Sequence, residues 1–427
     1  MRKKISLFIA ALSSCFLFAQ DTDKSKDEYF LYGRKIVDTL ASASMHGRGY
    51  VNDGDKIAAK YISDEFKTLG LKSFKSNYYQ KFSFAVNTFP NEVSLQTETK
   101  KLEVGKDFIV GPSSSFTSGE FEIIWFDKST ASDKKKLKKL MKQKVEQKVI
   151  VVDTTGIKEQ FKKAQSWLNR AAGIIYIREK LTWDMSQTVT KQFSFETLRD
   201  VLNKNDKKVT VKIQDKFFPD YTSQNVIGYI EGSKQPDSFI VFTAHYDHLG
   251  QMGPDVYFPG ANDNASGTAM LLTLAKYYSK PENKPKYSIM FIAFSAEEVG
   301  LIGSAYYVAN PYFSLKKIKF LINMDILGTG DEGIKVVNAT VFETQFKQLQ
   351  MLNAQGSYLK EIQPRGKAAI SDHYFFTYNG VPSFFIYTLG GIKAYHDVYD
   401  KRETLPLDEF YDLFHLLIDF TTTIDNI

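Results

Sequence analysis

Short apolar runs alternate with helix-like segments over the carboxyl-terminal half of the chain. Runs at 239–244, 287–294, 320–324 and 383–387 predict strands, and between them apolar residues recur at helical spacing. This alternation is typical of sheets whose strands are joined by helices on both faces. We therefore expect an α/β fold with a mixed, mostly parallel sheet flanked by helices.

A second pattern of strands and helices precedes this one in the chain. Its predicted strands lie at 121–126, 149–152 and 173–177, with a predicted helix at 161–172. Before it, residues 27–72 have helical spacing that stops at Gly70. The expected organisation is a signal peptide at 1–20, the amino-terminal part of the main domain at 21–95, an inserted smaller α/β domain at 96–220 and the main domain at 221–427.

Composition changes this picture little. The 427 residues are 43% apolar and 24% charged, which is ordinary globular usage and excludes a disordered or fibrous protein. The formal charge of +6 falls to +3 without Arg2, Lys3 and Lys4, so we expect no nucleic acid partner. Eight lysines within 134–148 could form a basic patch, but a solvated helix face is the preferred interpretation.

The first residues resemble an export signal. A basic start precedes an apolar run at 5–19, which is too short for a permanent membrane span. We therefore expect a periplasmic or secreted protein without stable membrane insertion. The alternative is a lipid anchor on Cys15, which would tether the protein to the cell envelope. Cys15 is the single cysteine, so the chain has no internal disulfide.

Ionisable residues follow every predicted strand of the main domain. They are His245 and Asp247 after the first strand, Glu297 and Glu298 after the second, Asp325 after the third and His396 after the fourth. A further carboxylate, Asp263, lies in the loop 260–267 ahead of an apolar helix at 268–278. Ligands bind beyond the carboxyl ends of strands in such sheets, so we expect these side chains to meet there.

Imidazole and carboxylate groups together suit zinc, and a catalytic zinc keeps an open position for water. Two ions held close together need a bridging carboxylate, and they can stabilise both the attacking water and the developing oxyanion. Taken alone, Asp263 is more often a helix cap. Beside two histidines and several carboxylates, a metal site becomes the better interpretation.

Six segments, in their order and spacing, resemble the di-zinc aminopeptidase family of metallopeptidases, whose relatives include glutaminyl cyclase and the transferrin receptor. They are 245–250, 260–267, 294–301, 323–325, 371–373 and 396–400. The inserted region is similar to a protease-associated domain in its strand pattern. The family usually has threonine and proline where this chain has Asp397 and Val398. The resemblance implies a zinc-exopeptidase-like fold.

The resemblance also implies a role for each site residue. Asp263 would bridge two zinc ions, His245 and Asp325 would complete one site, and Glu298 and His396 would complete the other. Glu297 would be the general base. Asp247 would accept a hydrogen bond from His245, and the peptide bond between Asp263 and Asn264 would be cis.

The implied function is an exported zinc-dependent aminopeptidase that removes amino-terminal residues from peptides. A metal-bridging water would lose its proton to Glu297, which would then protonate the departing amine. The alternative is a glutaminyl-peptide cyclotransferase-like enzyme with a single zinc. A non-catalytic binding ectodomain is disfavoured, because all five ligand positions are filled.

Several other polar residues are given structural interpretations. We expect His248 and His373 to support the site without touching metal, and His415 to be packed in a helix. The loop around His46 receives no role. Tyr374, Tyr387 and Tyr395 are candidates for donating a hydrogen bond to the oxyanion, and that donor is left unassigned.

Overall fold

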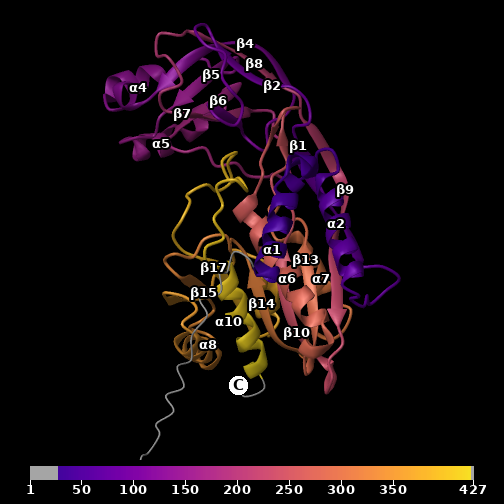
Figure 1. Cartoon of the computed structure of the whole chain (residues 1–427). Coiled ribbons are helices and arrows are strands. Elements are labelled where there is room, and N and C mark those ends of the chain that lie inside the picture. Colours follow the sequence, from indigo (N-terminus) through magenta and orange to yellow (C-terminus); the bar gives the residue numbers. More distant parts are fainter. Residues whose placement is uncertain (1–26, 425–427) are drawn as a thin grey trace, which may run out of the picture.

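The computed structural model describes residues 27–424, which form two large β-sheets and a small two-stranded one, with helices around them (Figure 1). The larger sheet has eight strands. In spatial order they are β1 (Tyr79–Thr88), β9 (Lys216–Ile230), β13 (Tyr287–Phe294), β10 (Gln235–His245), β14 (Ile318–Met324), β17 (Ser383–Thr388), β15 (Ile334–Val337) and β16 (Ile362–Arg365).

The four strands predicted from apolar runs form the centre of this sheet. β13, β10, β14 and β17 are parallel neighbours, while β9 and β15 run antiparallel beside them. β13 is buried at every position, as expected for a strand covered on both faces. The expected mixed α/β sheet is therefore confirmed.

Alternate residues of β10 pack into two different cores, one on each face of the sheet. Ile240 and Phe242 point to a core completed by α1 (Glu28–Leu40), α2 (Gly54–Thr68), α6 (Gly267–Ser279), α8 (Glu343–Gly356) and α10 (Phe410–Thr423). Phe239 and Val241 point to the opposite core, completed by α7 (Ile302–Ala309) and α9 (His373–Tyr378). The two-residue period of a strand produces this division.

The helical spacing expected over 27–72 belongs to two helices, α1 and α2, which are separated at the loop around His46. A 3₁₀ segment, η2 (Ala43–Arg48), contains His46, Gly47 and Arg48 at positive φ. A side chain at Gly47 would place its Cβ 2.4 Å from the carbonyl oxygen of Gly250. The chain turns here because it packs directly against the backbone that follows β10.

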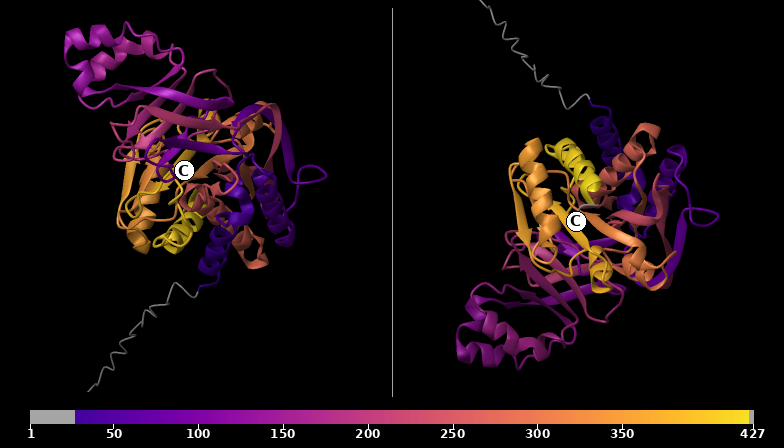
Figure 2. Two further views of the ribbon diagram at one scale, coloured as in Figure 1. Left: turned by 90° about the horizontal axis from the view of Figure 1, so that it is seen from above. Right: turned by 90° about the horizontal axis from the view of Figure 1, so that it is seen from below.

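The second sheet has seven strands and lies to one side of the larger one (Figures 1 and 2). In spatial order they are β2 (Val93–Thr97), β8 (Lys208–Ile213), β4 (Thr117–Phe126), β5 (Lys148–Val152), β6 (Gly173–Arg178), β7 (Phe193–Leu198) and β3 (Phe108–Val110). The helices α3 (Lys128–Ala131), α4 (Lys134–Leu140) and α5 (Lys158–Leu168) accompany it. The strand and helix alternation expected here is present.

The two faces of the second sheet meet different surroundings. One packs under its own helices, with Trp167 and Leu168 of α5 in that core. The other forms a core that also contains Leu249, Met252 and Phe258, which follow β10. The second sheet therefore shares an apolar core with the segment that carries the candidate site.

The remaining short elements are β11 (Gln251–Met252), β12 (Val256–Tyr257), η3 (Ala261–Ser266), η4 (Pro281–Asn283) and η5 (Leu315–Lys317). None of the helices within residues 27–424 has the length and apolar character needed to cross a bilayer. The expected signal peptide and Cys15 lie outside the described residues.

Candidate metal centre

Asp263 lies between two histidines that are far apart in the sequence. Its Oδ1 is 3.3 Å from Nε2 of His245, and its Oδ2 is 3.2 Å from Nε2 of His396. All three side chains are buried. One carboxylate thus presents a separate oxygen to each imidazole, which is the arrangement needed to bridge two cations.

A second carboxylate accompanies each histidine. Asp325 Oδ1 lies 3.3 Å from His245 Nε2, and Glu298 Oε2 lies 3.1 Å from His396 Nε2. Glu297 joins His245 and Asp325 in a group whose ligand atoms lie within 4.8 Å of one another. Another such group combines His245, Asp263 and Glu298. All five predicted ligands and Glu297 are therefore brought together at one edge of the sheet.

The strand ends deliver these residues, and the backbone then turns. β10 ends at His245 and Asp325 follows β14 directly. After β13, Ala296 has a positive φ, and the amides of Gly300 and Leu301 both donate to the carbonyl of Glu297. Adjacent residues of an extended strand would point to opposite faces, so this turn allows Glu297 and Glu298 to face one site.

Backbone amides hold the segment that carries Asp263. The amide of Asn262 donates to Oδ1 of Asp400 at 2.8 Å, and that of Asp263 donates to Oδ2 at 3.0 Å. The peptide bond between Asp263 and Asn264 is cis, as the resemblance implies. Asp400, which lies in the family-like segment 396–400, therefore fixes the backbone at Asn262 and Asp263.

Arg48 is the main residue that sequence reasoning missed. Its guanidinium is fully buried and donates five hydrogen bonds to carbonyl oxygens, which belong to Leu40, Tyr246, Pro259, Gly260 and Asp263. It joins η2 to both the end of β10 and the Asp263 segment. The signal was the pair of glycines flanking Arg48 in the loop at 45–49, which was interpreted as a plain loop.

His245 is oriented differently from the expectation. Its Nδ1 lies 3.1 Å from the backbone carbonyl of Asp247 and 3.8 Å from the carboxylate, so the predicted carboxylate hydrogen bond is wrong. The Asp247 carboxylate instead accepts from the Tyr50 hydroxyl and the Glu297 amide. Asp247 thus positions Glu297, while its carbonyl directs Nε2 of His245 toward the carboxylates.

His396 is oriented by the second sheet's part of the chain. Its Nδ1 lies 2.7 Å from the carbonyl of Trp183, and the Trp183 amide donates to the carbonyl of His396. The indole of Trp183 is buried against Phe258, with ring centroids 4.7 Å apart. A segment between β6 and β7 therefore directs Nε2 of His396 toward Asp263 and Glu298.

His248 holds the second oxygen of Glu298. Its Nδ1 lies 2.7 Å from Oε1 of Glu298, whose Oε2 faces His396. His248 belongs to neither group of close ligand atoms. Its position agrees with the expected supporting role.

The site favours positive charge strongly. Burial lowers the pKa of His245, but Asp325, Glu297 and hydrogen bonds with Asp263 raise it well above its ordinary value. Burial raises the pKa of Glu297 well above its ordinary value. Burial also raises the pKa of Glu298, but His396 and His248 bring it down to about 2. Carboxylates that stabilise a buried imidazolium in this way would also stabilise a divalent cation in its place.

A cavity of about 390 Å³ opens on these residues. Its remaining wall is formed by Ile326, Arg365, Ile370, Phe385, Tyr387 and Tyr395. Tyr387 and Tyr395 therefore stay candidates for the oxyanion donor. The ring of Tyr395 also stacks on His396, with centroids 4.0 Å apart.

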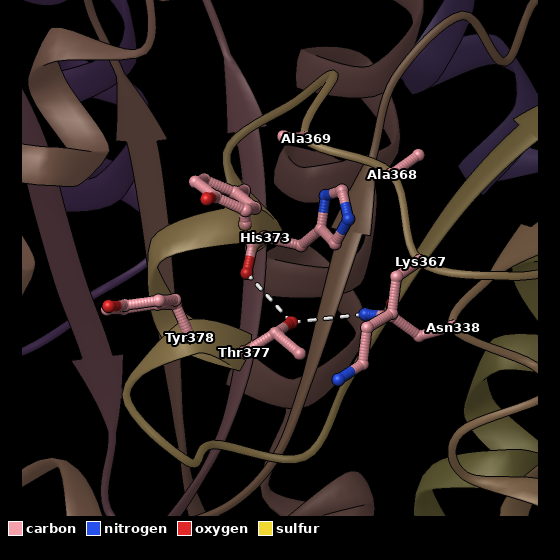
Figure 3. Close-up of a pocket in the computed structure, with 8 residues that line it drawn as sticks. Asn338, Lys367, Ala368, Ala369, His373, Thr377 and Tyr378 are labelled. Carbon is pink, nitrogen blue, oxygen red and sulfur yellow. Dashed lines mark hydrogen bonds between the residues drawn. The ribbon is translucent and has the colours of Figure 1, made fainter.

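Tyr374 lies in a different cavity of about 260 Å³, together with His373 and Lys367 (Figure 3). There the Thr377 hydroxyl donates to the His373 carbonyl and accepts from Asn338. The His373 ring packs near Phe385, and its Nδ1 is buried without a hydrogen-bond partner. His373 lies beside the metal-binding groups rather than within them, as expected.

The donor set fits zinc. Two imidazole nitrogens and several carboxylate oxygens converge, and each histidine has its Nδ1 directed at a backbone carbonyl, which leaves Nε2 for a metal. His245 and Asp325 would hold one ion, and His396 and Glu298 the other, with Asp263 between them.

Comparison with known proteins agrees with this geometry. Residues 225–421 match the model of peptidase family M28. That segment belongs to peptidase family M28. The resemblance drawn from the sequence motifs is thereby confirmed.

Two known peptidases match parts of the chain. Aminopeptidase YwaD of Bacillus subtilis is 32% identical over 210 residues, which cover 48% of this chain and 41% of that protein. A probable zinc metalloprotease of Pyrenophora tritici-repentis is 38% identical over 118 residues, covering 27% of this chain and 24% of that protein. The chain thus matches less than half the length of either relative.

Two solved structures resemble the whole fold. The zinc aminopeptidase BSAP of Bacillus subtilis has a TM-score of 0.67 at 20% identity, covering 92% of this chain and 94% of that one. A peptidase M28 precursor from Shewanella amazonensis has a TM-score of 0.68 at 17% identity, covering 92% of each chain. The shared fold thus extends across both sheets.

Proposed function

We propose that this protein is a zinc-dependent aminopeptidase that releases amino-terminal residues from peptides. The single observation that carries the proposal is the Asp263 carboxylate, whose two oxygens face His245 and His396 separately. The family match and the names of the relatives support the same class of hydrolase. The proposal also includes export through residues 1–20 and the expected division into domains at 96–220 and 221–427.

Glu297 and Asp247 have different roles in the proposed hydrolysis. Two zinc ions, when bound, would supply an activated water and polarise the peptide carbonyl. Glu297 removes a proton from the attacking water and donates it to the departing amine. Asp247 holds Glu297 by accepting a hydrogen bond from its backbone amide at 3.2 Å.

The inserted smaller domain at 96–220, in this proposal, supports the site without contributing a catalytic side chain. The carbonyl of Trp183 fixes the His396 ring, and Lys180 pairs with Asp397 at 3.1 Å. These two contacts hold the loop that carries His396.

The experiment that tests the proposal combines metal analysis with a substrate screen. Purified protein is analysed for zinc and assayed on aminoacyl p-nitroanilides before and after chelation. We expect two zinc ions per chain and release of amino acids, which stops on chelation and returns with zinc. Turnover that survives complete metal removal would contradict the proposal. Cyclisation of amino-terminal glutamine, without release of amino acids, would indicate a cyclotransferase instead.

A further inference from the structure

The lining of the 390 Å³ cavity contains one cationic side chain besides the metal-binding groups. Ile326, Ile370, Phe385, Tyr387 and Tyr395 give the rest of this lining an apolar and aromatic surface, and Arg365 lies among them. Nothing in the family-like segments marks Arg365, because it lies six residues before Ser371.

The fold fixes Arg365 at this position. It is the last residue of β16, where it pairs with Val337 of β15, and Val337 pairs in turn with Phe385 of β17. Its Nη1 donates to the Tyr387 hydroxyl at 2.9 Å, and its guanidinium carbon lies 5.9 Å from the centre of that ring. The half-buried guanidinium is therefore held by an aromatic partner on the cavity wall.

Within residues 27–424, no carboxylate lies at ion-pair distance from this guanidinium, although other arginines of the chain are paired. Arg178 binds Glu196, and Arg199 binds Asp153 and Glu179. Arginine carries five N–H donors in a planar fork that matches a carboxylate. Arg365 uses one of them on Tyr387, so the others are available to a ligand.

The charges that line the cavity also favour an anionic ligand. Four carboxylates line it, from Asp263, Glu297, Glu298 and Asp325. Two divalent cations would balance these four charges, so Arg365 would leave the lining with a net positive charge. Such a cavity favours an anionic group of the substrate over a neutral one.

We propose that Arg365 binds a carboxylate of the substrate close to the scissile bond. This inference rests on the proposed peptidase function and specifies its substrate class. The carboxylate has two possible sources: an acidic side chain on the amino-terminal residue, or the free α-carboxylate of a short peptide.

Two pairs of isosteric substrates distinguish these sources. The first pair is the p-nitroanilides of glutamate and glutamine, and the second is the dipeptide Leu-Gly and its amide. Each kcat/KM is measured for the zinc-loaded wild type, Arg365→Met, Arg365→Gln and Arg365→Lys. Lys367→Met is the matched control, because it removes a nearby positive charge that lines the other cavity.

The proposal expects a preference of about tenfold or more for the anionic member of one pair, as a charge-assisted hydrogen bond provides. Arg365→Met and Arg365→Gln should abolish that preference, Arg365→Lys should keep part of it, and Lys367→Met should keep it. Free glutamate should also inhibit the wild type more strongly than glutamine if the side chain is the source.

Three results would overturn the proposal, and they have different meanings. Equal kcat/KM within both pairs, with leucine p-nitroanilide still hydrolysed, would exclude the role of Arg365 and leave the peptidase intact. A zinc-loaded protein that hydrolyses none of the substrates would overturn the proposed function as well. The wild-type comparison can therefore overturn the proposal even if the variants do not fold, while a wild-type preference that persists in folded Arg365→Met and Arg365→Gln would also exclude Arg365.

Discussion

The two sheets of this protein place ionisable groups in opposite ways. At the carboxyl ends of the larger sheet, His245, Asp247 and Asp263 are at most 4% exposed and crowd together. On the second sheet, charged groups such as Lys208 and Glu120 pair at the surface with side chains about half exposed, and the buried Asp206 accepts a hydrogen bond from the neutral Thr99 hydroxyl. Burying charge is costly unless it is paired or binds a metal. The larger sheet therefore keeps a cluster of buried charged groups that is costly for folding, and a functional metal site explains why the cluster is kept.

We expect the largest loss of activity when Asp263, at the centre of the buried cluster, is replaced. Asp263→Asn removes the negative charge that both histidines face. Activity should fall by about a thousandfold or more, because both of the proposed cations would lose a ligand. Zinc content should fall with it, as measured by metal analysis.

Asp206→Asn is the control on the second sheet. Asp206 is also buried, and it accepts from the Thr99 hydroxyl. Zinc should remain at the wild-type level in this variant. Equal zinc loss in both variants would remove the distinction between the two sheets.

Glu297→Gln separates proton transfer from metal binding. The substitution keeps the shape of the side chain but removes its ability to accept a proton. The kcat should fall by about 10²- to 10⁴-fold, while zinc content stays close to that of the wild type. Steady-state kinetics and metal analysis check this, and zinc loss with activity retained would exclude Glu297 as the base.

Arg48→Met tests the packing beneath the cluster. Five carbonyl oxygens would lose their donor in a fully buried position. The free energy of unfolding should fall by about 3–5 kcal/mol, measured by urea denaturation.

Arg402→Met is the comparison for that measurement, because Arg402 donates to the Asp38 carbonyl at an exposed position. Its effect should stay within about 0.5 kcal/mol. A similar decrease in the free energy of unfolding in both variants would mean that the buried Arg48 stabilises the fold no more than the exposed Arg402 does.

Trp183→Ala tests the contact between the two regions. Loss of the indole should displace the carbonyl that orients His396, and zinc affinity should fall about 10- to 100-fold, as for other groups that orient a ligand. Zinc titration of the apoprotein measures this. Trp167→Ala removes another buried tryptophan of the second sheet, away from His396, and should leave zinc affinity unchanged.

The smallest effect concerns acid stability of the second sheet. Burial raises the pKa of Asp127, but hydrogen bonds from Lys204, Ser129 and Thr130 lower it to about 2. Because an unfolded aspartate has a pKa of about 3.9, this carboxylate stabilises the fold above about pH 4 and ceases to do so as the pH falls toward 2.

The Tm difference between wild type and Lys204→Met should therefore be largest above about pH 4 and shrink toward pH 2. Because Lys204 is 65% exposed, we expect its replacement to lower the free energy of unfolding by under about 1 kcal/mol. Lys208→Met, whose partner Glu120 is exposed, provides the comparison. A difference that grows in acid would contradict the assignment.

Strand periodicity predicted the centre of the fold well, because buried parallel strands are continuous apolar runs. β13 was predicted with its observed bounds of 287 and 294. The loop around His46 could be predicted but its conformation could not, since positive φ at His46 and Arg48 depends on contacts with the backbone near Gly250. Local spacing carries no information about such distant contacts.

The same distinction applies to the site. Its other acidic and imidazole residues could be predicted, because they follow strands whose carboxyl ends meet, whereas Asp263 lies in a loop ahead of a helix and received its bridging role from the family resemblance. Arg48 and Trp183 could not, because they act through hydrogen bonds with backbone carbonyls and leave no pattern of chemical residue types. Arg365 was missed for a related reason: it lies on β16, an edge strand that the apolar runs did not predict.

Anomalous diffraction at the zinc edge, on crystals of the zinc-loaded protein, tests the central claim most directly. The account predicts two peaks on either side of the Asp263 carboxylate, one beside Nε2 of His245 and the other beside Nε2 of His396. A single peak away from Asp263, or no peak in this cavity, would contradict it.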